Sequence, residues 1–167
     1  MTAASTDMKL RPREHAGTMP PAIGRREWFV LATVLVLGVV LRLLAFSRAA
    51  VEHFDEGVYA SNVYFGAPDY AYPQQRFFGP PMLPALIEMG MIVGIPPNVS
   101  ALMPSLLAGC AAIVAVWWFG RCWFGPPAGV AAATLLALSG FHVAFSATAL
   151  TDVLLGLWLV LAIHAIA

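Results

Sequence analysis

The apolar runs of this sequence constrain its fold more than any other feature. Residues 28–46 hold 19 residues with one charge, Arg42, and residues 100–119 hold 20 residues with none. Residues 128–145 have His142 as their one titratable group. A helix rises about 1.5 Å per residue, so runs of this length match the roughly 30 Å hydrocarbon core of a bilayer. We therefore predict a transmembrane helix over each of these three ranges.

A fourth apolar run, residues 153–167, is 15 residues long and lacks the basic or aromatic anchor expected at a helix end. We therefore expect the sequence to be the N-terminal part of a larger membrane protein, with a truncated fourth span. The predicted fold class is all-α, a polytopic transmembrane helical bundle. Residues 1–26, rich in proline, hydroxyl and charged residues, are expected to form a disordered cytoplasmic tail. Residues 27–167 are expected to form the transmembrane domain.

Composition excludes several classes of protein. Sixty per cent of the residues are hydrophobic and 11% are charged, and the mean hydropathy is +0.78, which is typical of a membrane protein. The charges of nine basic and nine acidic residues cancel, so the net charge argues against a nucleic-acid partner. Cys110 and Cys122 lie in or beside an apolar run, where cysteine behaves as a small hydrophobe, and they imply no disulfide framework.

The basic residues predict the orientation in the membrane. Residues 1–27 hold five basic and three acidic residues, whereas residues 47–99 hold Arg48 and Arg76 against five acids. The positive-inside rule therefore places the N-terminus in the cytoplasm and residues 47–99 outside, in a multi-pass protein of the plasma or inner membrane. A cleaved signal peptide is the alternative, since Ala45-Phe46-Ser47 resembles a cleavage site, but the apolar run exceeds the usual length of about 7 to 15 residues.

The outer loop, residues 47–99, is long for a connection, and such loops are commonly functional or structured. Asp55 and Glu56 precede a short stretch able to form a helix, so both acids are expected at a favourable helix N-terminus. Residues 82–95 are apolar but too short to span, and we expect them to lie along the membrane interface. With the N-terminus inside, Asp152 returns to the same side as Asp55 and Glu56.

Three short motifs occur in order along the chain: Asp55-Glu56-x-x-Tyr59, Pro80-Pro81-x-x-Pro84 and Leu150-Thr151-Asp152. In this order and with this sidedness, the sequence from about Trp28 onward resembles the N-terminal region of GT-C glycosyltransferases. The similarity is to the family 39-like group, which includes protein O-mannosyltransferases and lipid A aminoarabinose transferases. Two positions depart from that group: Gly79 stands where many relatives have Lys or His, and Ala147 where they often have Arg.

The resemblance implies transfer of a sugar from a polyprenyl-phosphate carrier to a lipid, glycan or protein acceptor at the outer membrane face. Such a reaction needs a carboxylate to take the acceptor's proton and cations to hold the phosphate. Asp55 matches the catalytic aspartate of the family and is assigned the base role. Glu56 is assigned to orienting the acceptor or the site, because neighbouring helical residues face different ways. The candidate substrate-binding residues are Arg42, Tyr59, Arg76 and Asp152.

Each of these residues has a plainer alternative. Asp55 and Glu56 also fit a solvated helix start, and Asp152 fits a helix-start residue beside Thr151. Arg42 lies four residues inside the end of its run, where a cation either snorkels to the interface or faces a polar cavity. His53 has no second ligand at metal-binding spacing, so no metal site or cofactor is assigned, and participation of a divalent ion is left open.

Two other functions remain open. The first is a non-catalytic membrane protein, such as a transporter or an assembly subunit, whose outer acids bind a cation or a partner. A transporter is expected to place ionisable groups near the bilayer centre, whereas this sequence places them near the outer boundary, which favours the transferase. The second is an inactive, truncated relative of the transferases.

Overall fold

The computed structural model describes residues 22–51, 54–61 and 81–166. Within these ranges the chain is all-helical, with no strand, so the predicted fold class is confirmed at that level. The helices are α1 (Arg25–Phe46), α2 (Phe54–Ser61), α3 (Met82–Ile92), α4 (Pro97–Phe124), α5 (Pro126–Leu138), α6 (Gly140–Phe145) and α7 (Asp152–Ile166). The expectation for the cytoplasmic tail falls mostly on residues 1–21, which lie outside the described residues.

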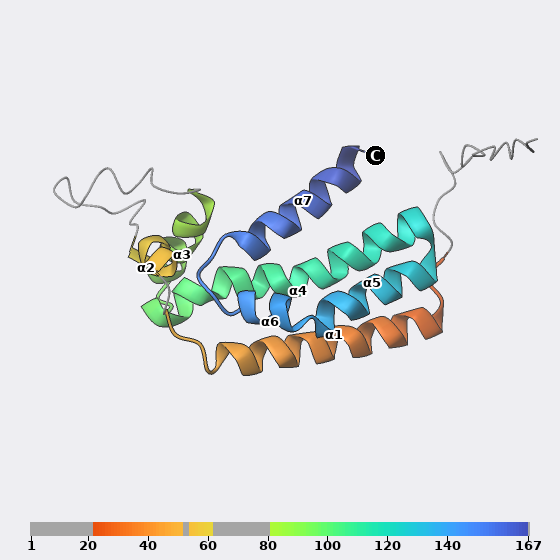
Figure 1. Cartoon of the computed structure of the whole chain (residues 1–167), viewed down its shortest axis with the longest axis horizontal. Helices are drawn as coiled ribbons and strands as arrows, with labels where there is room; N and C mark the ends of the chain where they lie inside the picture. The colour runs from red at the N-terminus through yellow and green to blue at the C-terminus, as the bar shows by residue number, and fades with distance from the viewer. Residues whose placement is uncertain (1–21, 52–53, 62–80, 167) are drawn as a thin grey trace, which may run out of the picture.

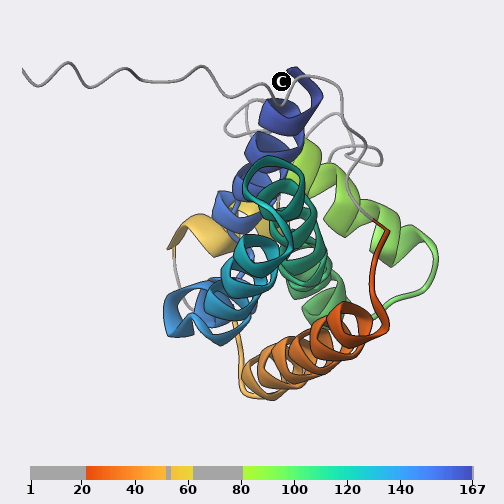
Figure 2. The same ribbon diagram turned by 90° about the vertical axis from the view of Figure 1, so that its right-hand side faces the viewer.

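Helix α4 forms the centre of the bundle and contacts α1, α3, α5 and α7. Figure 1 shows α1 and α4 running in opposite directions, with α5 beside both. In the end-on view of Figure 2, α1 and α7 lie on opposite sides of α4. The short helices α2 and α3 contact each other and lie together at one end of the bundle (Figure 1).

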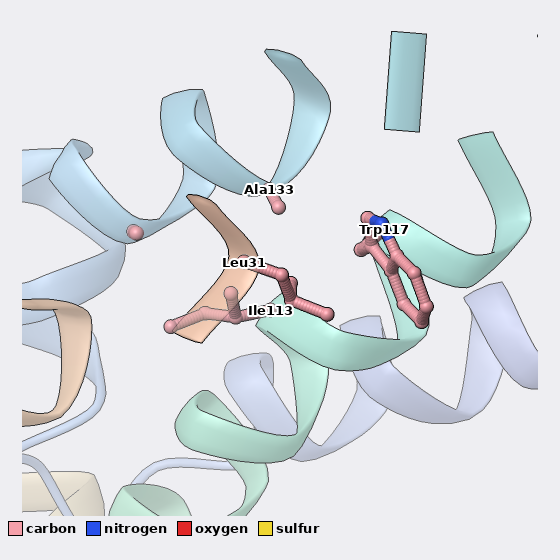
Figure 3. Close-up of a cluster of buried hydrophobic side chains, with 5 residues drawn as sticks. Leu31, Ile113, Trp117 and Ala133 are labelled. Atoms are coloured by element: carbon pink, nitrogen blue, oxygen red, sulfur yellow. The ribbon is translucent and has the colours of Figure 1, made fainter. Parts of the chain in front are cut away.

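The main core lies where α1, α4 and α5 meet. Its buried residues are Leu31, Ile113, Trp117, Ala133 and Ala137, four of which are labelled in Figure 3. Gly125, at a φ of 94°, separates α4 from α5, and Pro126 then begins α5 at a position that needs no backbone N–H donor. At this end, the Arg121 guanidinium donates to both carboxylate oxygens of Glu27, at 2.7 and 3.4 Å. This ion pair joins α4 to the start of α1.

Two of the predicted spans have the length and hydropathy needed to cross a membrane. These are α1, with 22 residues, and α4, with 28, which extends past residues 100–119 at both ends. Large apolar side chains such as Phe29, Val36 and Leu44 are exposed on α1, as expected for a helix whose outer face contacts lipid. Helices α3, α5 and α7 are apolar but shorter, so three full spans and a fourth are not confirmed.

The prediction of one continuous helix over residues 128–145 was wrong. Helix α5 ends at Leu138, and Ser139 adopts an extended conformation with ψ of 110°. The Ser139 hydroxyl then accepts a hydrogen bond from the His142 backbone N–H and caps the N-terminus of α6. Serine is a favoured N-cap residue. The hydropathy of the run does not reveal this break, because the residues next to Ser139 are apolar.

The close packing of α4 against α5 depends on Gly129. A Cβ atom at this position would lie 2.6 Å from the Trp117 carbonyl oxygen and 2.8 Å from the Arg121 backbone nitrogen. We expect Gly129→Ala to destabilise the bundle by about 1 to 3 kcal/mol, because neither backbone atom can move without separating the two helices. The measurement is the apparent Tm of the purified protein in detergent.

Gly156→Ala is the matched control, since no atom lies within 4 Å of a Cβ at that position. Its Tm should be unchanged or slightly higher, because alanine is favoured over glycine in a helix interior. Equal Tm values for the two variants would contradict close α4–α5 packing at Gly129.

Candidate functional site

The acidic pair lies on α2, at the end of the bundle where α1 finishes. Ala60 of α2, Phe46 at the end of α1 and Ala49 after it pack against one buried cluster. The same cluster contains Ala101 and Leu102 of α4 and Ala149 from the α6–α7 connection. The end of α1, the start of α4 and the α6–α7 connection therefore meet beside α2.

Asp55 and Glu56 have opposite environments. The Glu56 side chain is buried, with 1% of its surface exposed, and its Oε1 accepts a hydrogen bond of 2.8 Å from the Ala149 backbone N–H. Asp55 is exposed, and its carboxylate makes no hydrogen bond or ion pair with another described residue. Consecutive residues of a helix point about 100° apart, so one carboxylate faces the bundle while the other is accessible.

Asp152 begins α7, three residues after the Ala149 N–H that binds Glu56. Its side chain is exposed, and Tyr59 on α2 is half-buried. The preceding connection is held in place by the Ser105 hydroxyl, which donates to the Leu150 carbonyl oxygen at 3.1 Å. The structure thus brings Asp55, Glu56 and Asp152 to the same end of the bundle. Arg76 lies outside the described residues.

Arg42 is fully enclosed, with 0% of its surface exposed. Its Nη1 donates to the carbonyl oxygens of Gly38 and Ala137, at 3.0 and 3.4 Å. Its Nη2 donates to the Leu136 carbonyl oxygen and to His142 Nδ1, at 3.3 and 2.8 Å. Its Nε donates to the Ser146 hydroxyl at 3.3 Å. The guanidinium therefore neither snorkels to the interface nor faces an open cavity.

Sequence reasoning missed the partners of Arg42. Nothing in the sequence connects His142 to a residue 100 positions earlier. One weak signal was present, because His142 and Ser146 are four residues apart and share a helix face. In the structure Ser146 donates to the His142 carbonyl oxygen at 2.6 Å, so both residues face the guanidinium together.

An apolar cavity of about 300 Å³ lies between α3, α4 and α7. Met82 and Leu86 of α3, Met103 and Leu107 of α4, and Leu157 and Trp158 of α7 form much of its lining. The lining includes Met82, the first residue of α3, and Leu154 in the first turn of α7. Among the described residues, no group of three or more His, Cys, Asp or Glu side chains is arranged to hold a metal ion.

Comparison with protein families decides the class of this chain. Residues 79–167 match the model of the family described as dolichyl-phosphate-mannose-protein mannosyltransferase. The chain belongs to this mannosyltransferase family. The resemblance to GT-C glycosyltransferases inferred from the sequence is therefore confirmed, and the chain is of the membrane glycosyltransferase type. No curated protein and no solved structure matches it.

The family match covers α3 to α7 and includes Asp152, whereas Arg42, Asp55, Glu56, Tyr59 and Arg76 all precede its first residue. In this mannosyltransferase-family chain, the acidic pair is connected to the matched region through the contact between Glu56 and Ala149. The structure, and not the family match, brings α2 together with the start of α7.

The Glu56 contact generates a prediction about stability. Glu56→Leu removes the acceptor and leaves the Ala149 N–H without it in a buried position, which costs about 1 to 3 kcal/mol. Glu56→Gln keeps an amide oxygen that can accept the same bond, so its Tm in detergent should fall less. If Glu56→Leu melts at the temperature of the parent protein, the contact does not hold α2 in place.

Proposed function

We propose that this protein transfers a sugar from a polyprenyl-phosphate carrier to a lipid, glycan or protein acceptor at the outer face of the membrane. The carrying observation is the accessible carboxylate of Asp55, placed at the same end of the bundle as Asp152. Membership of the mannosyltransferase family supports the reaction class. The donor, the acceptor and the membrane face named here are all parts of the proposal.

Asp55 acts as the general base. The acceptor's hydroxyl or amine gives its proton to the Asp55 carboxylate as its oxygen or nitrogen attacks the anomeric carbon of the sugar. The bond between that carbon and the phosphate oxygen breaks, and the lipid phosphate leaves with the electron pair. Proton transfer to a positioned carboxylate contributes about 10² to 10⁴ in rate. Exposure suits this role, since the acceptor has to reach the carboxylate.

Glu56 has the orienting role, because its carboxylate is buried and occupied by the Ala149 N–H. Tyr59 and Asp152, at the same end of the bundle, are our candidates for contacts to the sugar or the acceptor. The apolar cavity between α3, α4 and α7 is large enough for part of an isoprenoid chain.

A leaving phosphate needs cationic contacts. Arg42 and Arg76 were both assigned to this contact from the sequence. Since the Arg42 guanidinium is already surrounded by acceptors within the bundle, we favour Arg76 as the phosphate ligand. Its guanidinium fork is well suited to a bidentate phosphate contact.

The base assignment is tested by Asp55→Asn in the full-length protein. This variant should insert and melt like the parent, since the Asp55 side chain is exposed, while sugar transfer from the lipid donor falls by about 10² or more. Glu56→Gln should have a milder effect on turnover. Near-normal turnover of Asp55→Asn, measured with a radiolabelled lipid-linked sugar, would remove Asp55 from the mechanism.

The proposed sidedness is tested by single cysteines in intact cells, with Cys110 and Cys122 replaced by alanine. Ala50→Cys and Thr151→Cys, which flank the acidic end, should react with a membrane-impermeant maleimide. Phe124→Cys, exposed at the opposite end, should react only after permeabilisation, because the basic N-terminal segment keeps that end inside. Labelling of residues 50 and 151 from opposite sides would separate the halves of the proposed site.

A further inference from the structure

The Arg42 side chain bridges α1 to the break between α5 and α6. Its donors reach the carbonyl oxygens of Leu136 and Ala137, in the last turn of α5. The final four carbonyls of a helix lack intrahelical N–H partners, and a cation at this end also complements the helix dipole. Arg42 thus adds hydrogen bonds at this end of α5, where the Leu136 carbonyl oxygen also accepts from the Ser139 backbone N–H at 3.4 Å.

The other side of the guanidinium holds α6. His142 Nδ1 accepts from Nη2, which requires that nitrogen to be unprotonated. The Ser146 hydroxyl, at the end of α6, accepts from Nε. Arg42 therefore binds both segments that flank the break and fixes their relative placement.

Gly109 of α4 makes room for this arrangement. A Cβ atom at Gly109 would lie 2.8 Å from Ser146 Cβ and 3.1 Å from Arg42 Nε, and would also meet the Ser146 hydroxyl oxygen. A methyl group here would displace Ser146 from the guanidinium while leaving every charge unchanged. Gly109 therefore offers an independent way to disturb the same contact.

The contact is connected to the acidic site by a short segment. Ser146, which binds Arg42, is three residues before Ala149, whose N–H binds Glu56. Both residues are buried, with 0% of their surface exposed. The segment from Ser146 to Ala149 is thus held at one end from α1 and at the other from α2.

We propose that Arg42 is a positioning residue for the transfer site. By fixing the α5–α6 break and Ser146, it places the Ala149 N–H against Glu56 and so sets the position of α2 with Asp55. The expected effect on turnover rests on the proposed function, whereas the placement of the segment from Ser146 to Ala149 by Arg42 does not. A displacement of about 1 Å at a reacting group can reduce turnover by about 10²-fold.

The kinetic test compares Arg42→Gln and Gly109→Ala with Arg48→Gln in the full-length protein. Arg48 is exposed near the same end of α1 and is the matched control for loss of one arginine. We expect the first two variants to lower kcat at least about 10-fold, with the KM for the lipid donor changed less than about threefold, because positioning affects the reacting groups more than donor binding. Arg48→Gln should retain the parent values.

The structural test follows the reactivity of Ala149→Cys with a maleimide, in a background with Cys110 and Cys122 replaced by alanine. Ala149 has 0% of its surface exposed, so this thiol should be protected in the parent and in Arg48→Gln. Arg42→Gln and Gly109→Ala should increase its rate of labelling several-fold. The double variant Arg42→Gln/Gly109→Ala should be labelled at about the rate of the more reactive single variant. Both substitutions disturb the same contact, so their effects are not independent.

Two results would overturn the proposal. If Arg42→Gln raises the KM for the donor about 10-fold with kcat unchanged, Arg42 binds the phosphate and does not position α2. If labelling of residue 149 stays at the parent level in both variants, the segment is not held by Arg42. The labelling needs no turnover, so it tests whether Arg42 holds the segment from Ser146 to Ala149 even if the parent protein transfers no sugar. If Arg42→Gln fails to fold, Gly109→Ala tests the same contact.

Discussion

A guanidinium group inside an apolar bundle needs hydrogen-bond acceptors, because an isolated charge in hydrocarbon is costly and arginine stays protonated. In this protein the acceptors are the Gly38 carbonyl of α1, two carbonyls in the last turn of α5, and the His142 and Ser146 side chains of α6 and its end. The last turn of a helix lacks N–H partners from a following turn, which leaves the Leu136 and Ala137 carbonyls accessible to the guanidinium. The break after Leu138 thus supplies several of the acceptors that make the burial of Arg42 tolerable, and Arg42 in turn joins the segments on both sides of the break to α1.

The division of labour between the two adjacent acids follows from this course. Because the connection after Ser146 contacts α2, the Glu56 carboxylate can bind its backbone, while Asp55, the preceding residue of the helix, is turned toward solvent. A buried carboxylate is stable only with hydrogen-bond donors, and the Ala149 N–H is one of them. A single helical turn thus combines an anchoring acid with an accessible acid, an arrangement that suits a base acting on an external acceptor.

The family match and the packing describe different parts of the same site. The matched region, residues 79–167, supplies α3, the central helix α4, the broken α5–α6 pair and the start of α7. The segment ahead of it supplies Arg42 and the acidic pair. The two parts are joined in the proposed site, since Arg42 binds α5 and α6 and Glu56 binds the connection to α7.

The sequence by itself determined the helical class, the two long apolar helices α1 and α4, and the resemblance to the transferases, because these depend on composition, run length and short local motifs. It also anticipated that Asp55 and Glu56 would face different ways, which follows from helix geometry alone. Only the tertiary structure decided that Glu56 binds Ala149, that Arg42 is enclosed, and that residues 128–145 are interrupted at Ser139. The contacts of Glu56 with Ala149 and of Arg42 with Leu136 and Ser146 join residues 93 to 104 positions apart. Hydrogen bonds at such separations leave no period or spacing in the sequence, because they arise when helices pack.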